Sequence, residues 1–303
     1  MVSIILFWIL SFVLGLILIA CFVYFLNPYS LIVGKCRNLL ELVMLLFKLK
    51  FHALTMNGKK WSFVDFFENM VDTKEDIVQF IFIEHDEHIS RSGLERHANQ
   101  IAHWSKDVLK LQQGDTVALM MLNRPDFVAY WLGMAKLGIR TALLNTNITG
   151  KPFLHSVILS VQDSSKKILI LDNELQSILQ NEIQELKSQG VTVIVWDTVV
   201  TNTVHSYPTQ RPDRALRSQV KESDPFLYIF TSGTTGLPKA SKISHTRYYL
   251  GSIPLPVVCY LRPGVRMYSC LPLYHSAAGM LGVGAALTSG ATLVIRYVLY
   301  SLH

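Results

Sequence analysis

The sequence predicts an α/β protein with a largely parallel sheet, preceded by a single transmembrane helix. Two observations predict this class: an uncharged apolar stretch opens the chain, and short β-prone runs alternate with helical patterns through the rest. Of the 303 residues, half are hydrophobic and only 17% are charged, whereas soluble proteins have about 25% charged residues. We therefore expect a membrane anchor region, 1–55, and one folded region, 56–303.

The apolar excess is concentrated in Ile4–Leu26, which reads IILFWILSFVLGLILIACFVYFL. A bilayer core requires about 20 such residues in a helix. The first basic residues follow at Lys35 and Arg37, which predicts a single-pass anchor with the folded region in the cytosol. A cleaved signal peptide is the alternative, but its apolar core spans only about 7–15 residues and follows a basic start, which is missing here.

The next stretch, Leu39–Phe51, is shorter and carries Glu41, Lys48 and Lys50. An amphipathic helix at the cytosolic membrane surface fits this pattern, and a helix packed on the folded region is the alternative. The net charge of +6 is scattered, so basic residues near the anchor are expected to meet anionic lipid rather than nucleic acid. The four cysteines form no CxxC pair, and no metal site is predicted.

Beyond residue 51 the strand candidates are runs of β-prone residues, several of them continuously apolar as in strands buried on both faces. They are Phe80–Glu84, Thr116–Met121, Thr141–Leu144, Lys167–Leu171, Val191–Trp196, Leu227–Thr231, Met267–Leu271 and Thr292–Ile295. Helical patterns lie between them at Leu94–Leu109, Asp126–Leu137, Pro152–Gln162, Glu174–Ser188 and Ala277–Leu287. This alternation predicts parallel strand–helix–strand units. The polar stretch Thr201–Ser223 reads as a loop or linker.

The stretch Tyr228–His245, YIFTSGTTGLPKASKISH, is the strongest functional signal. A buried strand leads into hydroxyl donors, glycines that let a ligand approach the backbone, and the cation Lys239. Such a loop suits phosphate oxygens. It is not a Walker A loop, because Gly233 and Gly236 are too close together and Lys239 lies between Pro and Ala. A hydroxyl-rich surface turn is the alternative.

These residues resemble the phosphate loop of the acyl-adenylating enzymes, and more narrowly the fatty acid transport proteins, which are also very long-chain acyl-CoA synthetases. Gly114–Ile148 resembles the family's first block, including its Leu-Asn-Thr-Asn turn, and Leu271–Arg296, which contains His275, resembles its second block. The resemblance implies an acyl-adenylate-forming N-domain fold. It implies that a long-chain or very long-chain fatty acid reacts with ATP to give acyl-AMP and pyrophosphate, and that coenzyme A then displaces AMP.

The resemblance also implies roles for single residues. It assigns the ATP and AMP contacts to Tyr228, Thr231, Ser232, Gly233, Thr234, Thr235, Gly236 and Lys239. It places His275 near the reacting carboxylate, so that His275 and Lys239 are the catalytic candidates. Because Ser276 is a plausible helix N-cap, a histidine that merely packs at the start of helix Ala277–Leu287 is the alternative.

The resemblance ends at Arg296. The family's adenine- and magnesium-binding Tyr-Gly-x-Thr-Glu segment, its ribose-binding aspartate and its C-terminal lid have no counterpart here, so Mg²⁺ ligands are expected in that missing part. The alternative function is a truncated, non-catalytic membrane protein that binds nucleotide or fatty acid, or regulates a full-length partner. The endoplasmic reticulum, plasma membrane and peroxisome stay open as locations, and homo-oligomerisation stays open as well.

Overall fold

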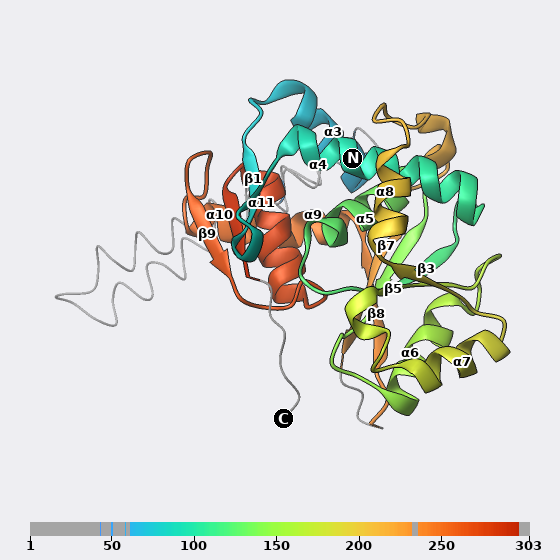
Figure 1. Cartoon of the computed structure of the whole chain (residues 1–303). Helices are drawn as coiled ribbons and strands as arrows, with labels where there is room; N and C mark the ends of the chain where they lie inside the picture. Colours follow the sequence, from blue (N-terminus) through green and yellow to red (C-terminus); the bar gives the residue numbers. More distant parts are fainter. Residues whose placement is uncertain (1–42, 44–49, 51–57, 59–60, 232–235, 297–303) are drawn as a thin grey trace, which may run out of the picture. The chain divides into compact units, whose positions relative to one another are not determined.

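The computed structural model describes residues 43, 50, 58, 61–231 and 236–296 (Figure 1). The chain divides into two units, Met1–His52 and Ala53–His303. The predicted anchor, Ile4–Leu26, lies outside the described residues, as does all of Leu39–Phe51 except Val43 and Lys50. Within the described part, no helix has both the length and the apolar character needed to cross a membrane.

A six-stranded sheet forms the centre of the second unit, in the order β6-β5-β3-β4-β7-β8. Its strands are β3 (Thr116–Met120), β4 (Arg140–Leu143), β5 (Ile168–Asp172), β6 (Thr192–Trp196), β7 (Pro225–Thr231) and β8 (Lys239–Ser244). All neighbouring pairs are parallel except β7 and β8, which form an antiparallel hairpin. Every residue of β3 and β5 is buried, as expected for central strands covered on both faces.

A second, four-stranded sheet has the order β2-β1-β10-β9. Its strands are β1 (Val78–Phe82), β2 (Glu87–Ser90), β9 (Arg266–Ser269) and β10 (Thr292–Ile295). β10 is parallel to both β1 and β9, and only β2 is antiparallel. The predicted strands are thus confirmed to within a few residues, and so is their largely parallel arrangement.

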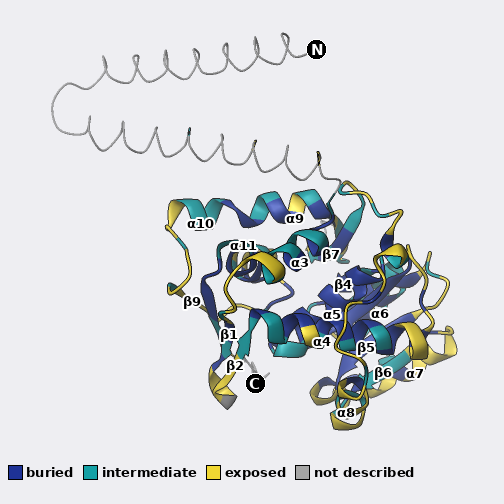
Figure 2. Ribbon diagram, turned by 90° about the horizontal axis from the view of Figure 1, so that it is seen from above, coloured by how far each residue is buried: buried dark blue, intermediate teal, exposed yellow. Residues whose placement is uncertain are grey.

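Helices cover both sheets (Figures 1 and 2). They are α3 (Phe63–Thr73), α4 (Arg91–Trp104), α5 (Pro125–Lys136), α6 (Gly150–Val161), α7 (Gln180–Ser188), α8 (Thr198–His205), α9 (His245–Ser252), α10 (Pro254–Val258) and α11 (Ala285–Ser289). α6 and α7 share one hydrophobic core with β3 and β5, whereas α4 packs on α5 and α8. α5 begins with a proline, whose fixed φ suits the first turn of a helix.

The predicted loop or linker Thr201–Ser223 is wrong in two parts and irregular, as predicted, in the rest. Its first residues complete α8, and Arg214–Arg217 forms a 3-10 turn. The carboxylate of Asp197 caps α8 by accepting a hydrogen bond from the backbone N–H of Val200, at 2.8 Å. Val204 is fully buried. One cap and one buried side chain therefore hold a helix whose β-branched residues have low helix propensity.

Candidate functional site

The hairpin of β7 and β8 carries the predicted phosphate loop. Thr231, the last residue of β7, is paired directly with Lys239, the first residue of β8. The Thr231 hydroxyl lies 3.5 Å from the carbonyl oxygen of Lys239, to which it donates, and both residues are exposed. Within the described part of the chain, the Lys239 ammonium pairs with no carboxylate. The hairpin thus presents an unpaired cation at the end of the sheet, as a phosphate site requires.

The remaining predicted loop residues fall in two groups. Gly236 has a φ of 80°, in the left-handed region that favours glycine. The space where a Cβ would lie is open. Tyr228 lies within β7, half-buried and paired with Lys242. The other four, Ser232, Gly233, Thr234 and Thr235, lie outside the described residues.

His275 lies at the start of a π-helical segment, Ala277–Gly284, that continues into α11. Its ring is exposed and lies 4.7 Å from the ring of Tyr274. The Tyr274 hydroxyl accepts a hydrogen bond from the side-chain amide of Asn147, at 3.3 Å. Ser276 occupies the N-cap position of this segment, as predicted, but its side chain makes no capping hydrogen bond.

Asn147 lies four residues beyond the end of β4, the strand that pairs with β7. The Leu-Asn-Thr-Asn turn therefore connects the segment that carries His275 to the edge of the six-stranded sheet where β7 ends.

Asn123 makes a second connection between the two sheets. It follows β3, and its side-chain oxygen accepts a hydrogen bond from the Leu273 N–H at 2.8 Å. Its side-chain nitrogen donates to the carbonyl oxygens of Leu271, at 3.0 Å, and of Arg296, at 3.1 Å. One buried amide thus positions the segment before His275 against the end of β3. The sequence analysis missed Asn123: its place after a predicted buried strand marks a polar residue at the end of the sheet but does not reveal its partners.

A crevice of about 310 Å³ opens at the carboxyl ends of β3, β5 and β6. The chain turns from β3 into α5 on one face of the sheet, and from β5 toward α7 on the other. Loops that diverge to opposite faces leave a crevice at this topological switch point, where α/β proteins often bind ligands.

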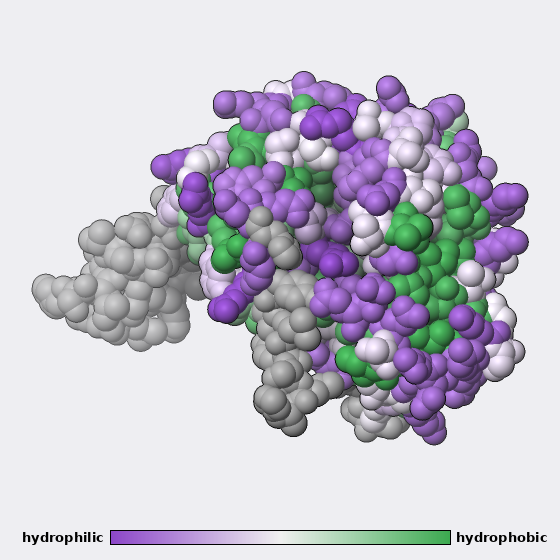
Figure 3. Space-filling model, viewed as in Figure 1, coloured by the Kyte–Doolittle hydropathy of each residue, from purple (hydrophilic) through white to green (hydrophobic). Residues whose placement is uncertain are grey.

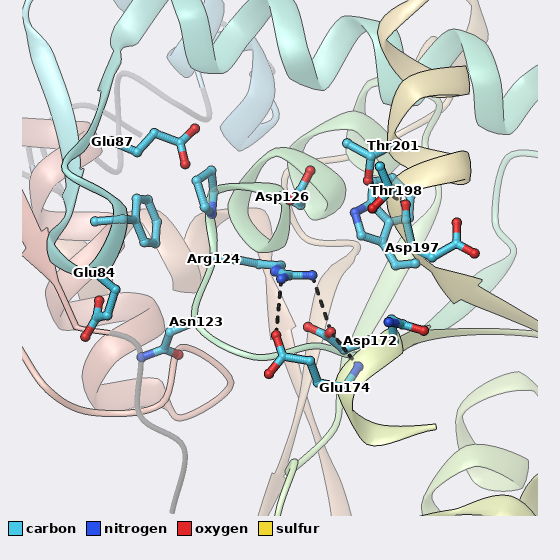
Figure 4. A pocket seen from close by; sticks show the side chains of 14 residues that line it. Glu84, Glu87, Asn123, Arg124, Asp126, Asp172, Glu174, Asp197, Thr198 and Thr201 are labelled. Atoms are coloured by element: carbon cyan, nitrogen blue, oxygen red, sulfur yellow. Dashed lines mark hydrogen bonds and ion pairs between the residues drawn. The ribbon is translucent and has the colours of Figure 1, made fainter. Parts of the chain in front are cut away.

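Figure 4 shows Arg124 at the centre of this crevice, between Asp172 and Glu174. Its guanidinium lies 3.3 Å from Asp172 and 3.6 Å from Glu174. Burial raises the pKa of Asp172, although the Arg124 charge and two backbone N–H donors oppose that effect. Asp126, also in the lining, accepts a 2.8 Å hydrogen bond from His97. Burial alone would raise the pKa of Asp126, but His97 and Arg124 together lower it.

The crevice and the hairpin differ in the sign of their charge. Six carboxylates line the crevice, from Glu84, Glu87, Asp126, Asp172, Glu174 and Asp197, and its one arginine is already paired with two of them. Such a surface repels a polyphosphate. The phosphate candidate is consequently the hairpin at Thr231 and Lys239. Among the described residues, no group of three or more His, Cys, Asp or Glu side chains is arranged to hold a metal ion.

Comparison with known proteins gives a consistent result. Residues 67–298 match the family model described as "AMP-binding enzyme". The chain is 38% identical over 224 residues to long-chain fatty acid transport protein 2 of Rattus norvegicus, covering 70% of this chain and 34% of that protein. It is 33% identical over 212 residues to long-chain fatty acid transport protein 1 of Homo sapiens, covering 67% of this chain and 32% of that protein. The chain therefore spans about a third of the length of these curated relatives.

Solved structures show the same fold. The N-terminal domain of FACL13 from Mycobacterium tuberculosis matches with a TM-score of 0.65 at 19% identity, over 79% of this chain and 58% of that one. ATP-bound MatB from Rhodopseudomonas palustris matches with a TM-score of 0.63 at 20% identity, over 76% of this chain and 44% of that one.

Proposed function

Because this chain belongs to the AMP-binding enzyme family, we propose that its folded unit holds the phosphates of ATP during activation of a long-chain or very long-chain fatty acid. The reaction is attack of the fatty acid carboxylate on the α-phosphate, which releases pyrophosphate and leaves acyl-AMP. The thiol of coenzyme A then displaces AMP. The observation that carries the proposal is the unpaired Lys239, placed opposite Thr231 where the β7–β8 hairpin meets its connecting loop.

The hairpin supplies what this chemistry requires of the protein. Attack on phosphorus moves negative charge onto phosphate oxygens, and preorganised donors stabilise that charge most effectively. The antiparallel pairing fixes the backbone on either side of the loop. Gly236 keeps open space beside the backbone. In this proposal the hydroxyls of Thr231, Ser232, Thr234 and Thr235 and the Lys239 ammonium contact the triphosphate, and Tyr228 lies beneath the nucleotide.

His275 is proposed to orient the fatty acid carboxylate by hydrogen bonding. Its exposed ring supports this role, because the ring is available to a ligand while the neighbouring Tyr274 is buried and bonded to Asn147. No step is assigned to Mg²⁺, because no described side-chain cluster fits it. The fatty acid class is supported by the relatives, which are named long-chain fatty acid transport proteins.

We propose further that the chain is a single-pass membrane protein with its folded unit in the cytosol, at the endoplasmic reticulum, plasma membrane or peroxisome. The uncharged Ile4–Leu26 and the basic residues that follow it support this topology. Uptake would follow from activation, because an acid joined to coenzyme A is charged and bulky and re-enters lipid at high cost.

The test measures ATP binding and fatty-acid-dependent exchange of pyrophosphate into ATP, with the full chain in detergent. Lys239→Ala should weaken ATP binding at least about tenfold, because a charge-assisted contact to phosphate is lost. Lys221→Ala, at an exposed lysine outside the hairpin, is the control and should leave binding unchanged. Equal ATP affinity for both variants would overturn the phosphate assignment. ATP binding that depends on Lys239 without any exchange would instead favour a nucleotide-binding protein without turnover.

A further inference from the structure

A groove of about 600 Å³ lies at the amino-terminal ends of β5 and β6, at the edge of the six-stranded sheet opposite Thr231. Three segments form it: the residues just before β5, the residues just before β6, and the end of the π-helix Ser105–Leu109 with Lys110. Neither the hairpin nor the crevice at Arg124 shares a lining residue with it.

Three lysines line this groove, Lys110, Lys166 and Lys167, and all are exposed. None of the lining residues is Asp or Glu. Among the described residues, none of the three ammonium groups forms an ion pair or a side-chain hydrogen bond. This is unlike Arg211 and Arg217, which are paired with carboxylates on α3 and α4. The lining of the groove thus carries three lysines and no carboxylate.

Asp115, which bonds to the lining residue Ser165, has both carboxylate oxygens engaged. Asp115 is buried, and its carboxylate accepts hydrogen bonds from Ser165, through both N–H and hydroxyl at 2.7 Å, and from the Gln112 N–H at 2.8 Å. Ser164 in turn is bonded to the backbone of Thr116 in both directions. These bonds fix the segment that carries Lys166 and Lys167 to the start of β3, so two of the lysines are borne on a fixed loop.

Lys110 is held in a conformation that costs energy. Its φ of 52° lies in the left-handed region, which is unfavourable for a residue with a side chain. Its N–H donates to the Ser105 carbonyl at 3.1 Å and closes the π-helix. Strained backbone and π-helical turns occur preferentially at functional sites. The π-helix also leaves Val108 51% exposed at the groove.

The rest of the wall is apolar. Ile194 of the edge strand β6 is half-buried and lines the groove beside Val108. Figure 3 shows hydrophobic surface bordered by hydrophilic side chains on the right side of the unit. A site with cations beside exposed apolar side chains suits a ligand that is anionic at one end and apolar at the other.

We propose that this lysine groove binds the phosphate headgroup of an anionic lipid at a membrane surface. The proposal does not depend on the proposed enzymatic function, because the groove contains none of the residues assigned to ATP or the fatty acid. Each lysine near an anionic surface should raise affinity about fivefold, so three lysines should raise it on the order of a hundredfold at low salt. The attraction should fall as salt screens it.

The test uses the full chain and measures the acetylation rate of each lysine by peptide mass spectrometry. Because the readout is specific to each lysine, attachment through the N-terminal apolar segment does not affect it. The chain is mixed with phosphatidylcholine vesicles, with vesicles of equal parts phosphatidylcholine and phosphatidylserine, or with inorganic phosphate alone. Lys74, Lys151 and Lys221 are matched controls, because they are exposed and likewise form no ion pair among the described residues.

Anionic vesicles should slow acetylation of the three groove lysines severalfold relative to the controls, and neutral vesicles should not. The triple variant K110E/K166E/K167E should lose a large part of the anionic-over-neutral preference in vesicle binding, while K74E/K151E/K221E, with the same net charge, should keep nearly all of it. Protection by inorganic phosphate alone, to the same extent, would assign the groove to a soluble phosphate ligand and overturn the lipid source. Equal protection of groove and control lysines, or none in any arm, would overturn the site itself.

Discussion

The Nζ of Lys136 lies 2.6 Å from Oε1 of Glu68, with the lysine side chain fully buried between α5 and α3. Glu95 of α4 contacts the same ammonium at 3.3 Å. Arg211 reaches Glu95 at 2.6 Å, and Arg217 reaches Glu68. These ion pairs connect α3, α4 and α5 to the segment that follows α8. Burial lowers the pKa of Lys136, and the two glutamates oppose that shift.

Replacing Lys136 should lower the free energy of unfolding more than replacing an exposed lysine. Lys136→Met leaves Glu68 and Glu95 buried with one cation fewer, which should lower the free energy of unfolding by about 3–5 kcal/mol. Urea denaturation followed by tryptophan fluorescence measures this. Lys187→Met, at an exposed position on α7, should change stability by no more than about 0.5 kcal/mol. A similar small change for both variants would show that the network contributes little.

His245 should make the fold sensitive to acid. Its ring stacks on Phe226 at 4.7 Å, and its Nδ1 accepts a hydrogen bond from the Phe63 N–H at 3.2 Å. Burial lowers the pKa of His245 to about 4; Asp65 and Asp224 oppose this effect, while Arg217 adds to it.

Since the native state resists protonation of this ring, its contribution is fully present above the unfolded pKa of about 6.5 and is lost as pH falls toward 4. The expected loss is about 3 kcal/mol. Unfolding free energies measured between pH 7 and about 4 test this. His245→Gln keeps an acceptor for Phe63 and should flatten that part of the profile. His103→Gln, at a half-exposed histidine, should leave it unchanged. An unaltered slope in the His245 variant would assign the acid sensitivity to other groups.

Asn123 should control the segment that carries His275. Asn123→Ala removes three hydrogen bonds and leaves the buried N–H of Leu273 without its acceptor. Stability should fall by about 2 kcal/mol, and amide exchange at Leu273 should accelerate more than exchange in β5. Asn181→Ala on α7 is the exposed control. Uniform acceleration in both places would mean that Asn123 supports the whole fold rather than this segment.

The sequon Asn147-Ile-Thr149 can report topology in cells. Asn147 is exposed, so an oligosaccharyltransferase in the lumen would reach it. If the folded unit faces the cytosol, Asn147 should carry no glycan, and endoglycosidase treatment should leave gel mobility unchanged. A fusion that adds a lumenal sequon before Ile4 provides the positive control. A glycan on Asn147 would reverse the proposed orientation.

Much of the strand pattern could be predicted because it depends on local composition. Thr116–Met121 and Lys167–Leu171 are continuous apolar runs, and they became β3 and β5 with shifts of only one residue at an end. Helix α8 could not be predicted from its β-branched residues, because its cap at Asp197 and the burial of Val204 outweigh their low propensity. Propensity is local, whereas these stabilising contacts depend on the tertiary fold.

In the candidate site, too, residues close together in the sequence could be predicted and residues brought together by the fold could not. Thr231 and Lys239 could be named as candidates because they lie in one short stretch of sequence. Asn123 was missed because its partners, Leu271, Leu273 and Arg296, are 148, 150 and 173 residues away in the chain. No pattern in the sequence around Asn123 shows that its amide connects two sheets. Arg124 and Asp172 were missed for the same reason, since they lie side by side only once β3 and β5 are paired.

The β7–β8 pairing also makes Lys239 depend on a residue that no ligand would touch. Ile243 is the one buried residue of β8, and it pairs with buried Leu227. Side chains alternate between the faces of a strand, so a slip of one residue would turn Lys239 to the opposite face. If Lys239 binds phosphate as proposed, a polar substitution at Ile243, four residues away, should lower nucleotide affinity. In a genetic screen such a variant would resemble a binding-site mutation, although its primary defect is the alignment of two strands.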